Sequence, residues 1–282
     1  TLFRSFTRYT NSYMISFVLP AILFGLIIGS FLNVVLLRHG ARAVTGRSGC
    51  MSCGKQLKWF DMLPVVSWLI LRGRCRHCHS RISVQYPLVE ASNAALFGCI
   101  AAAPISISLQ LIGCAVASLL LIISVYDLRH TIIPDGWVYA LALLSLLFSF
   151  TVAYEQGQID WLSLLWSGPL CALPFATLWL VSRGTWMGLG DAKLALGIGW
   201  LLGLEAGVYA IFLAFIIGAL VSVCILLPLP HLLRVIRTHR LGERTTSFTM
   251  KSEVAFGPFL VVATVLVWFA LLYQFPLPLL SV

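Results

Sequence analysis

The sequence predicts an all-α protein that crosses a membrane with about eight helices and exposes a small polar, cysteine-containing loop. Hydrophobic residues make up 60% of the 282 residues, charged residues make up 10%, and the mean hydropathy is +0.95. A soluble globular chain has about 25% charged residues, so the excess apolar surface here requires lipid. Several apolar stretches also reach the ~20 residues that a helix needs to cross the hydrocarbon core.

Eight apolar stretches are the predicted membrane spans. They are residues 12–37, 87–103, 105–125, 136–152, 162–182, 193–204, 206–229 and 254–272. The sixth is short and rich in glycine, and its boundary with the seventh is the least defined. The first is too long for the core of a signal peptide, so we expect it to be retained as a helix.

Basic residues set the predicted orientation, because Lys and Arg in short loops mark the cytoplasmic side. One group lies between the first two spans: Arg38, Arg42, Arg47, Lys55, Lys58, Arg72, Arg74, Arg76 and Arg81. A second lies between the last two: Arg234, Arg237, Arg240, Arg244 and Lys251. The loop with Glu155 and Asp160 has no basic residue. With eight spans, both basic loops are cytoplasmic and both termini lie outside. The net charge of +9 is then a topology signal and does not indicate a nucleic-acid partner.

Two Cys-x-x-Cys pairs lie in the first basic loop, Cys50 with Cys53 and Cys75 with Cys78. Twenty-one residues separate the pairs, which is typical of a zinc ribbon. Four thiolates close a tetrahedral structural site and leave no open position for chemistry. We therefore expect structural Zn²⁺ that folds a loop too small and polar to form its own core. Cytoplasmic thiols stay reduced, so disulfide or redox use is the weaker alternative.

The acidic residues are few, ten in the whole chain, and three of them lie at the predicted cytoplasmic ends of spans. Asp127 follows an apolar run, Asp135 precedes the fourth span and Asp191 ends a Gly-Leu-Gly-Asp segment. Ionisable groups near lipid are costly and commonly functional. Helix capping is the alternative role for Asp135 and for Asp191, whose charge Lys193 would then neutralise.

Two carboxylates at one membrane depth on separate spans indicate aspartyl protease chemistry. Held close together, Asp127 and Asp191 share a proton, because both cannot ionise cheaply. The ionised carboxylate activates a water, and the protonated one polarises the carbonyl under attack. Gly188 and Gly190 carry no side chain, so a substrate backbone or a neighbouring helix can approach closely.

Five segments resemble, in the same order, the signature blocks of the type IV prepilin peptidases, a family of bacterial membrane aspartyl proteases. They are GSFLNVV at 29–35, the two cysteine pairs with PVVS at 64–67 and RGRC at 72–75, YPLVE at 86–90, DLRHTIIPD at 127–135 and MGLGDAKL at 187–194. The resemblance implies that Asp127 and Asp191 are the catalytic pair. Asp135, Gly188, Gly190 and Lys193 would then support them.

The same resemblance implies the substrate and a second activity. The substrate is a prepilin or pseudopilin whose short basic leader is cut after a glycine, before a hydrophobic helix. Many members also methylate the new N-terminus with S-adenosylmethionine. Gly73 matches a family position tied to that activity, and Glu90 is a second candidate. The chain departs from the family at residues 38–40, where Arg-His-Gly stands in place of Arg-Leu-Pro, and the insert before Cys50 is brief.

We accordingly expect three parts: a first transmembrane helix at 1–37, a cytoplasmic cysteine loop at 38–85 and a transmembrane protease domain at 86–282. The expected location is the bacterial inner membrane, with the active site facing the cytoplasm. Other open readings are a presenilin-like protease, a transporter with proton-relaying carboxylates and a structural zinc-ribbon anchor. The sequence does not identify the precursors, nor whether they serve pili, type II secretion or DNA uptake.

Overall fold

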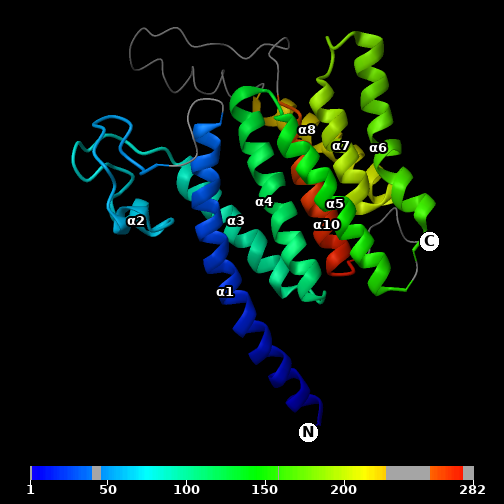
Figure 1. Cartoon of the computed structure of the whole chain (residues 1–282), viewed down its shortest axis with the longest axis horizontal. Helices are drawn as coiled ribbons and strands as arrows, with labels where there is room; N and C mark the ends of the chain where they lie inside the picture. The colour runs from blue at the N-terminus through cyan, green and yellow to red at the C-terminus, as the bar shows by residue number, and fades with distance from the viewer. Residues whose placement is uncertain (1, 40–45, 158, 227–254, 276–282) are drawn as a thin grey trace. The chain divides into compact units, whose positions relative to one another are not determined.

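The computed structural model describes residues 2–39, 46–157, 159–226 and 255–275, and within the first helix it describes side chains from Phe17 onward. The regular elements in these ranges are all helical, with two isolated antiparallel bridges in the cysteine loop (Figure 1). The predicted all-α class is therefore confirmed for the described residues. By its internal contacts the chain divides into two units, residues 1–122 and 123–282, with the division inside one helix.

Each of the eight predicted spans coincides with a helix. The helices are α1 (Leu2–Arg38), α3 (Gln85–Ala102), α4 (Ile107–His130), α5 (Asp135–Glu155), α6 (Trp161–Ser182), α7 (Leu189–Leu202), α8 (Leu204–Val221) and α10 (Gly257–Leu272). Five described segments are long and apolar enough to cross a membrane: Phe17–Arg38, Ile107–His130, Asp135–Glu155, Trp161–Ser182 and Leu204–Cys224. The helix α10 is apolar but shorter. A multi-pass membrane protein follows, and the count of eight stays a prediction.

The first unit is built on the close packing of α1 against α3. Gly25 and Gly29 lie one turn apart on α1, and a methyl group at either would come within 2.8 Å or 2.7 Å of the α3 backbone. Small residues at this spacing let two membrane helices approach closely. Asn93 of α3 adds a hydrogen bond across the interface, donating to the Gly25 carbonyl at 2.9 Å.

The loop between α1 and α3 contains two short helical turns, η1 (Trp59–Met62) and α2 (Val66–Ile70). Its hydrogen bonds are mostly local, between backbone groups a few residues apart. A side-chain contact ties the loop to the helices: the backbone N–H of Val65 donates to the buried Glu90 carboxylate of α3 at 2.7 Å. Glu90 thus connects the loop to the helical part of the first unit.

The second unit surrounds α7, the short glycine-rich helix, with α5, α6, α8 and α10 (Figure 1). The buried residues of α7 include Leu194, Ala195 and Ile198, and its glycines touch neighbours on two sides. A helix enclosed in this way needs little side-chain bulk, which explains its composition. It ends at Gly203, whose φ of +81° separates α7 from α8 with a single residue.

Two boundaries differ from those predicted. The helix α4 continues to His130, so Asp127 lies within its last turn and not after it. The apolar run alone does not mark this end, since Asp127, Arg129 and His130 are polar yet helical. The seventh predicted span becomes α8 followed by η2 (Ser222–Leu226), a short π-helical turn, and residues 227–229 lie outside the described part. The second basic loop, from Arg234 to Lys251, also lies outside it.

Candidate active site and metal centre

Asp127 is positioned by the start of a helix that begins 130 residues later in the chain. Its side chain is 4% exposed, and its Oδ2 accepts the backbone N–H of Gly257 at 3.1 Å. Gly257 is the first residue of α10, where N–H groups have no partner within the helix. Pro258 follows and has no N–H to satisfy. The positive end of α10 therefore faces the Asp127 carboxylate.

Ile133 connects this carboxylate to the second candidate aspartate. It belongs to the loop between α4 and α5, and its side chain packs beside both Gly257 and Gly190. A methyl group placed on these glycines would meet Ile133 at 3.5 Å and 3.1 Å. Gly257 also contacts Asp127, and Asp191 directly follows Gly190. The Ile133 side chain therefore lies beside a direct neighbour of each aspartate. The two aspartates predicted from sequence are therefore brought into the same region of the second unit.

Asp191 lies in the first turn of α7, outside the five long apolar helices, and is partly buried. Burial raises the pKa of its carboxyl group to about 7, and the nearby negative charge of Asp127 adds to this shift. The electrostatic coupling is the one expected of two carboxylates in a shared, poorly solvated environment. With this pKa, the Asp191 carboxyl group is mostly protonated below neutral pH and loses its proton as the pH rises through about 7.

The two glycines of the Gly-Leu-Gly-Asp segment differ in their surroundings. A side chain at Gly190 would press against Ile133, so its absence permits the loop after α4 to approach α7. Gly188 precedes α7 with ordinary extended dihedrals, and a methyl group there would contact nothing beyond its own segment. Gly188 thus has open space where a side chain would stand.

Asp135 and Lys193 form a pair with each other. The Lys193 ammonium lies 2.6 Å from Asp135 Oδ1, and the Asp135 side chain is 62% exposed. The structure therefore does not support the alternative role in which Lys193 neutralises Asp191, because the Lys193 ammonium pairs with the exposed Asp135. Asp135 is the first residue of α5, while Pro134 occupies the N-cap position, so Asp135 does not cap that helix with its side chain. The pair instead joins the starts of α5 and α7.

Gly257 was not identified among the site residues from sequence. Its local pattern, a glycine and a proline at the start of an apolar stretch, indicates only a helix N-terminus. Nothing in that pattern shows which carboxylate the helix faces. Tertiary structure alone reveals the contact with Asp127.

Replacing Gly257 by Ala is expected to disturb the Asp127 carboxylate. The new methyl carbon would lie 2.5 Å from Asp127 Oδ2, far inside van der Waals contact, so the carboxylate must move. A displacement of about 1 Å at a reacting group commonly costs on the order of 10²-fold in rate. Single-turnover cleavage of a precursor peptide would measure the loss. Gly136→Ala is the matched control, because a methyl group there meets nothing within 4 Å; equal rates for both variants would contradict the contact.

The four loop cysteines belong to two knuckles with the same backbone geometry. In each, the first cysteine's N–H donates to the carbonyl five residues later, at 3.0 Å for Cys50 and 2.9 Å for Cys75. Its carbonyl accepts from the residue four positions on, which has a positive φ (Gly54 +69°, His79 +54°). Each knuckle is closed by one of the two antiparallel bridges. This repetition directs four sulfurs to one place.

The sulfur positions fit a zinc ion. All four Sγ atoms lie within 4.8 Å of one another, and those of Cys50 and Cys78 are 3.8 Å apart. A tetrahedral site with Zn–S bonds of about 2.3 Å has sulfurs about 3.8 Å apart. Backbone N–H groups of Cys53 and Ser52 lower the pKa of the Cys50 thiol to about 6, which favours the thiolate that binds metal. His77 contacts Lys55 at 3.4 Å and is not part of the cluster.

Gly73 and Glu90 are both buried and both engaged in holding the loop. Gly73 has a φ of +66°, and a methyl group there would lie 2.8 Å from the Trp68 ring. The Trp68 indole in turn donates to the Ile82 carbonyl at 3.3 Å. Glu90 accepts from Val65, as described above. These contacts give both residues a role in the shape of the loop.

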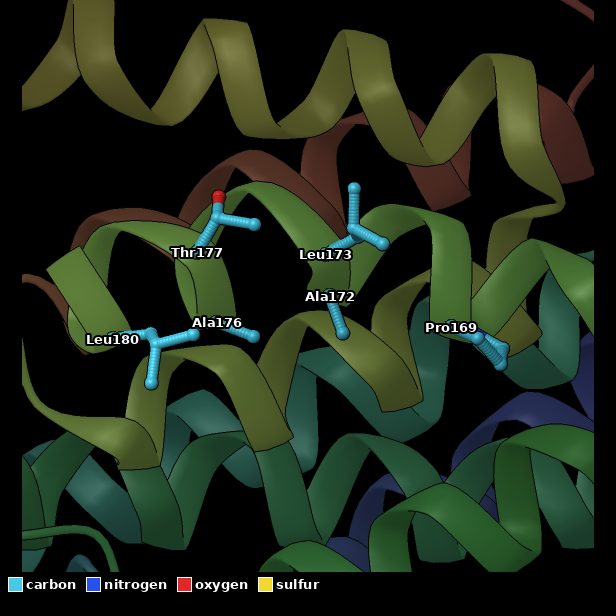
Figure 2. A pocket seen from close by; sticks show the side chains of 6 residues that line it. All are labelled: Pro169, Ala172, Leu173, Ala176, Thr177 and Leu180. Carbon is cyan, nitrogen blue, oxygen red and sulfur yellow. The ribbon is translucent and has the colours of Figure 1, made fainter.

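A shallow apolar hollow of about 280 Å³ lies along one helix, α6 (Figure 2). Its lining residues are Pro169, Ala172, Leu173, Ala176, Thr177 and Leu180. The Thr177 hydroxyl already donates to the Pro174 carbonyl at 2.8 Å. The hollow contains none of the candidate residues, so we do not assign the site to it.

Comparison with known proteins finds two family models in succession along the chain. Residues 23–104 match the bacterial peptidase A24 N-terminal domain, and residues 114–223 match the type IV leader peptidase family. The first match contains the cysteine loop, and the second contains both Asp127 and Asp191. No solved structure matches.

Several curated proteins named prepilin leader peptidase/N-methyltransferase are similar to the chain. One from Pseudomonas putida is 30% identical over 289 residues, covering 91% of each protein. One from Myxococcus xanthus is 33% identical over 229 residues, covering 78% of this chain and 64% of the relative's own length. One from Neisseria gonorrhoeae is 29% identical, covering 75% of this chain and 84% of the relative.

Proposed function

Because the chain belongs to the type IV leader peptidase family, we propose that it removes the leader from prepilin or pseudopilin precursors and methylates the new N-terminus. Family membership and the names of the relatives support both activities. The convergence of Asp127 and Asp191, through Ile133 and Gly257, is the observation that carries the peptidase proposal.

In the proposed hydrolysis a water lies between the two carboxylates. Asp127, which accepts an N–H from the positive end of α10, is the ionised member and takes a proton from the water as the oxygen attacks the scissile carbonyl. Asp191, which keeps its proton until the pH rises through about 7, donates a hydrogen bond to the carbonyl oxygen. When the tetrahedral intermediate collapses, the C–N bond breaks and the leaving amine takes up the proton held by Asp127. The pair is then ready for another water.

The position of the pair suits a substrate that is half embedded in lipid. Asp127 lies in the last turn of α4 and Asp191 in the first turn of α7, so both are near helix ends. A precursor's hydrophobic helix remains in the bilayer, while its leader presents the bond to water. The positive-inside rule places these ends on the cytoplasmic side of a bacterial inner membrane. The open space beside Gly188 is the proposed approach for the substrate backbone.

For the second activity, S-adenosylmethionine would supply the methyl group. We assign the cysteine loop to it, as the family resemblance implies; the loop lies within the matched N-terminal domain. Cys50, Cys53, Cys75 and Cys78 hold a structural Zn²⁺ in this proposal, and Gly73 and Glu90 maintain the loop's shape around it. No step of the transfer is assigned to these residues.

Mass spectrometry of a synthetic precursor after incubation with the purified protein tests both activities. Loss of the leader is expected with or without S-adenosylmethionine, and a methyl mass increment is expected only with it. Prolonged incubation that leaves the precursor intact would contradict the peptidase proposal and favour a transporter or an anchor. Leader loss without methylation would contradict the second activity alone.

Cleavage is expected to decline as the pH rises through about 7. The proposed chemistry needs one proton on the pair, and the raised pKa of Asp191 places the loss of that proton in this range. Because the pair titrates together, the profile reports an apparent pKa of both groups. Initial rates measured from pH 5 to 9 would show the decline. A rate that keeps rising to pH 9 would contradict the assignment.

A further inference from the structure

The cysteine loop exposes a row of large apolar side chains that zinc binding and catalysis do not explain. They are Trp59 (73% exposed), Met62 (44%), Leu63 (42%), Val66 (49%), Leu69 (60%) and Ile70 (70%). Val66, Leu69 and Ile70 are three and four residues apart and therefore share one face of α2. Exposed large apolar side chains gathered in one short segment commonly mark an interaction site. We refer to residues 59–70 as the exposed segment.

Two aromatic side chains of the exposed segment pack against the rest of the loop. Trp68 turns toward the loop, where its indole bonds to Ile82 and covers Gly73. Phe60 lies beneath Lys58 and Arg76, at 5.6 Å and 5.0 Å from the ring centre. Trp68 and Phe60 thus pack against other residues of the loop, whereas the exposed side chains do not take part in these contacts.

The hydrogen bond to Glu90 fixes where the exposed segment lies along the length of α3. Glu90 accepts a hydrogen bond from the backbone N–H of Val65, and Val65 immediately precedes α2. Glu90 is five residues into α3, about 8 Å along the helix axis from its start. Gly29 of α1 packs directly against Glu90 and lies within the apolar stretch Phe17–Arg38. The start of α2 is therefore held beside the part of the helix pair that enters the membrane.

Charge identifies the kind of surface that the exposed segment faces. Residues 55–81 contain Lys55, Lys58, Arg72, Arg74, Arg76 and Arg81 against the single acid Asp61. Asp61 pairs with Arg76 at 2.8 Å, and Lys58, Arg72, Arg74 and Arg81 are exposed. Apolar and aromatic side chains next to clustered basic residues are typical of segments that bind anionic bilayer surfaces.

We propose that the exposed segment is a membrane-surface anchor, which inserts its apolar side chains among the headgroups of anionic lipids. The basic residues around it contact the lipid phosphates. In this arrangement the metal-binding knuckles are held at the bilayer surface and do not move freely in the cytoplasm. The anchor is independent of the peptidase proposal, since it rests on the first unit alone.

Site-specific photo-crosslinking of the full-length protein in lipid nanodiscs tests the anchor. A benzoylphenylalanine residue replaces either Ile70 or, as the matched control, Met51, which is 83% exposed on the first knuckle outside the exposed segment. After irradiation, intact-protein mass spectrometry is expected to show several-fold more lipid adduct at position 70 than at position 51. The adduct at position 70 should also increase when phosphatidylglycerol is added to phosphatidylcholine. Equal zinc contents would show that the loop is folded in both variants.

Three results would overturn the proposal. Equal lipid adducts at the two positions would show that the exposed segment has no special contact with the bilayer. Crosslinks from position 70 to a second copy of the chain, or to added precursor, would assign the surface to a protein partner. Adducts that do not change with phosphatidylglycerol would remove the anionic-lipid preference.

Discussion

Replacing Asp127 or Asp191 by Asn is expected to lower precursor cleavage by about 10²- to 10⁴-fold, because acid–base catalysis by positioned groups contributes factors of this size. Asn has nearly the same shape, and its oxygen can still accept the Gly257 N–H that Asp127 accepts. It can neither take a proton from water nor share one with a second carboxylate. Single-turnover rates with a synthetic precursor would measure the loss, and unchanged zinc content would show that the protein folds.

Asp160→Asn is the matched control for these variants. Asp160 caps α6 by accepting N–H groups from Leu162 and Ser163, and Asn caps helices as well as Asp does. Cleavage by this variant is expected to equal that of the unaltered protein. A protein with both Asp127 and Asp191 replaced that still cleaves at the original rate would end the two-carboxylate proposal.

Replacing Cys75 by Ser is expected to remove zinc from the protein and to abolish methylation, with a smaller effect on cleavage. Cys75 is 5% exposed, and its sulfur is one of four within 4.8 Å of one another. Structural zinc contributes apparent binding energies of about 10–16 kcal/mol in small zinc-finger peptides. Its loss would therefore unfold a loop whose own hydrogen bonds are mostly local.

Metal analysis of the purified protein checks the zinc prediction directly. One zinc per chain is expected in the unaltered protein and well under one in the Cys75→Ser variant. Cys224→Ser is the matched control, since Cys224 is exposed in η2 and is not part of the sulfur cluster. An unchanged one-to-one zinc content after Cys75→Ser would remove the ribbon assignment. Methylation that survives zinc loss would separate the metal from that activity.

The two proposed activities are assigned to residues in different units of the protein. The sulfur cluster, Gly73 and Glu90 belong to residues 1–122, and Asp127, Asp191 and Gly257 belong to residues 123–282. The family models divide the chain in a similar place, between residues 104 and 114. Variants in one unit are therefore expected to affect one activity more strongly than the other. The three-part division at residues 37 and 85 stays a prediction.

The features that depend on composition and on short spacings could be predicted before the fold was known. The excess of apolar residues requires a membrane, and stretches of about 20 apolar residues become helices there because lipid offers no partner to backbone polar groups. A Cys-x-x-Cys pair is local enough that its turn geometry follows from a few residues. The candidate aspartates could be chosen because a carboxylate near lipid is rare and costly, and each one therefore stands out in the chain.

Tertiary structure decided which groups meet. Lys193 pairs with Asp135 and not with its sequence neighbour Asp191, and Gly190 accommodates Ile133. The helix that faces Asp127 begins 130 residues away, at a glycine whose surroundings no local pattern describes. These contacts depend on how separate helices pack, because apolar helix faces that touch protein and those that touch lipid have the same composition. Only the packed arrangement distinguishes them.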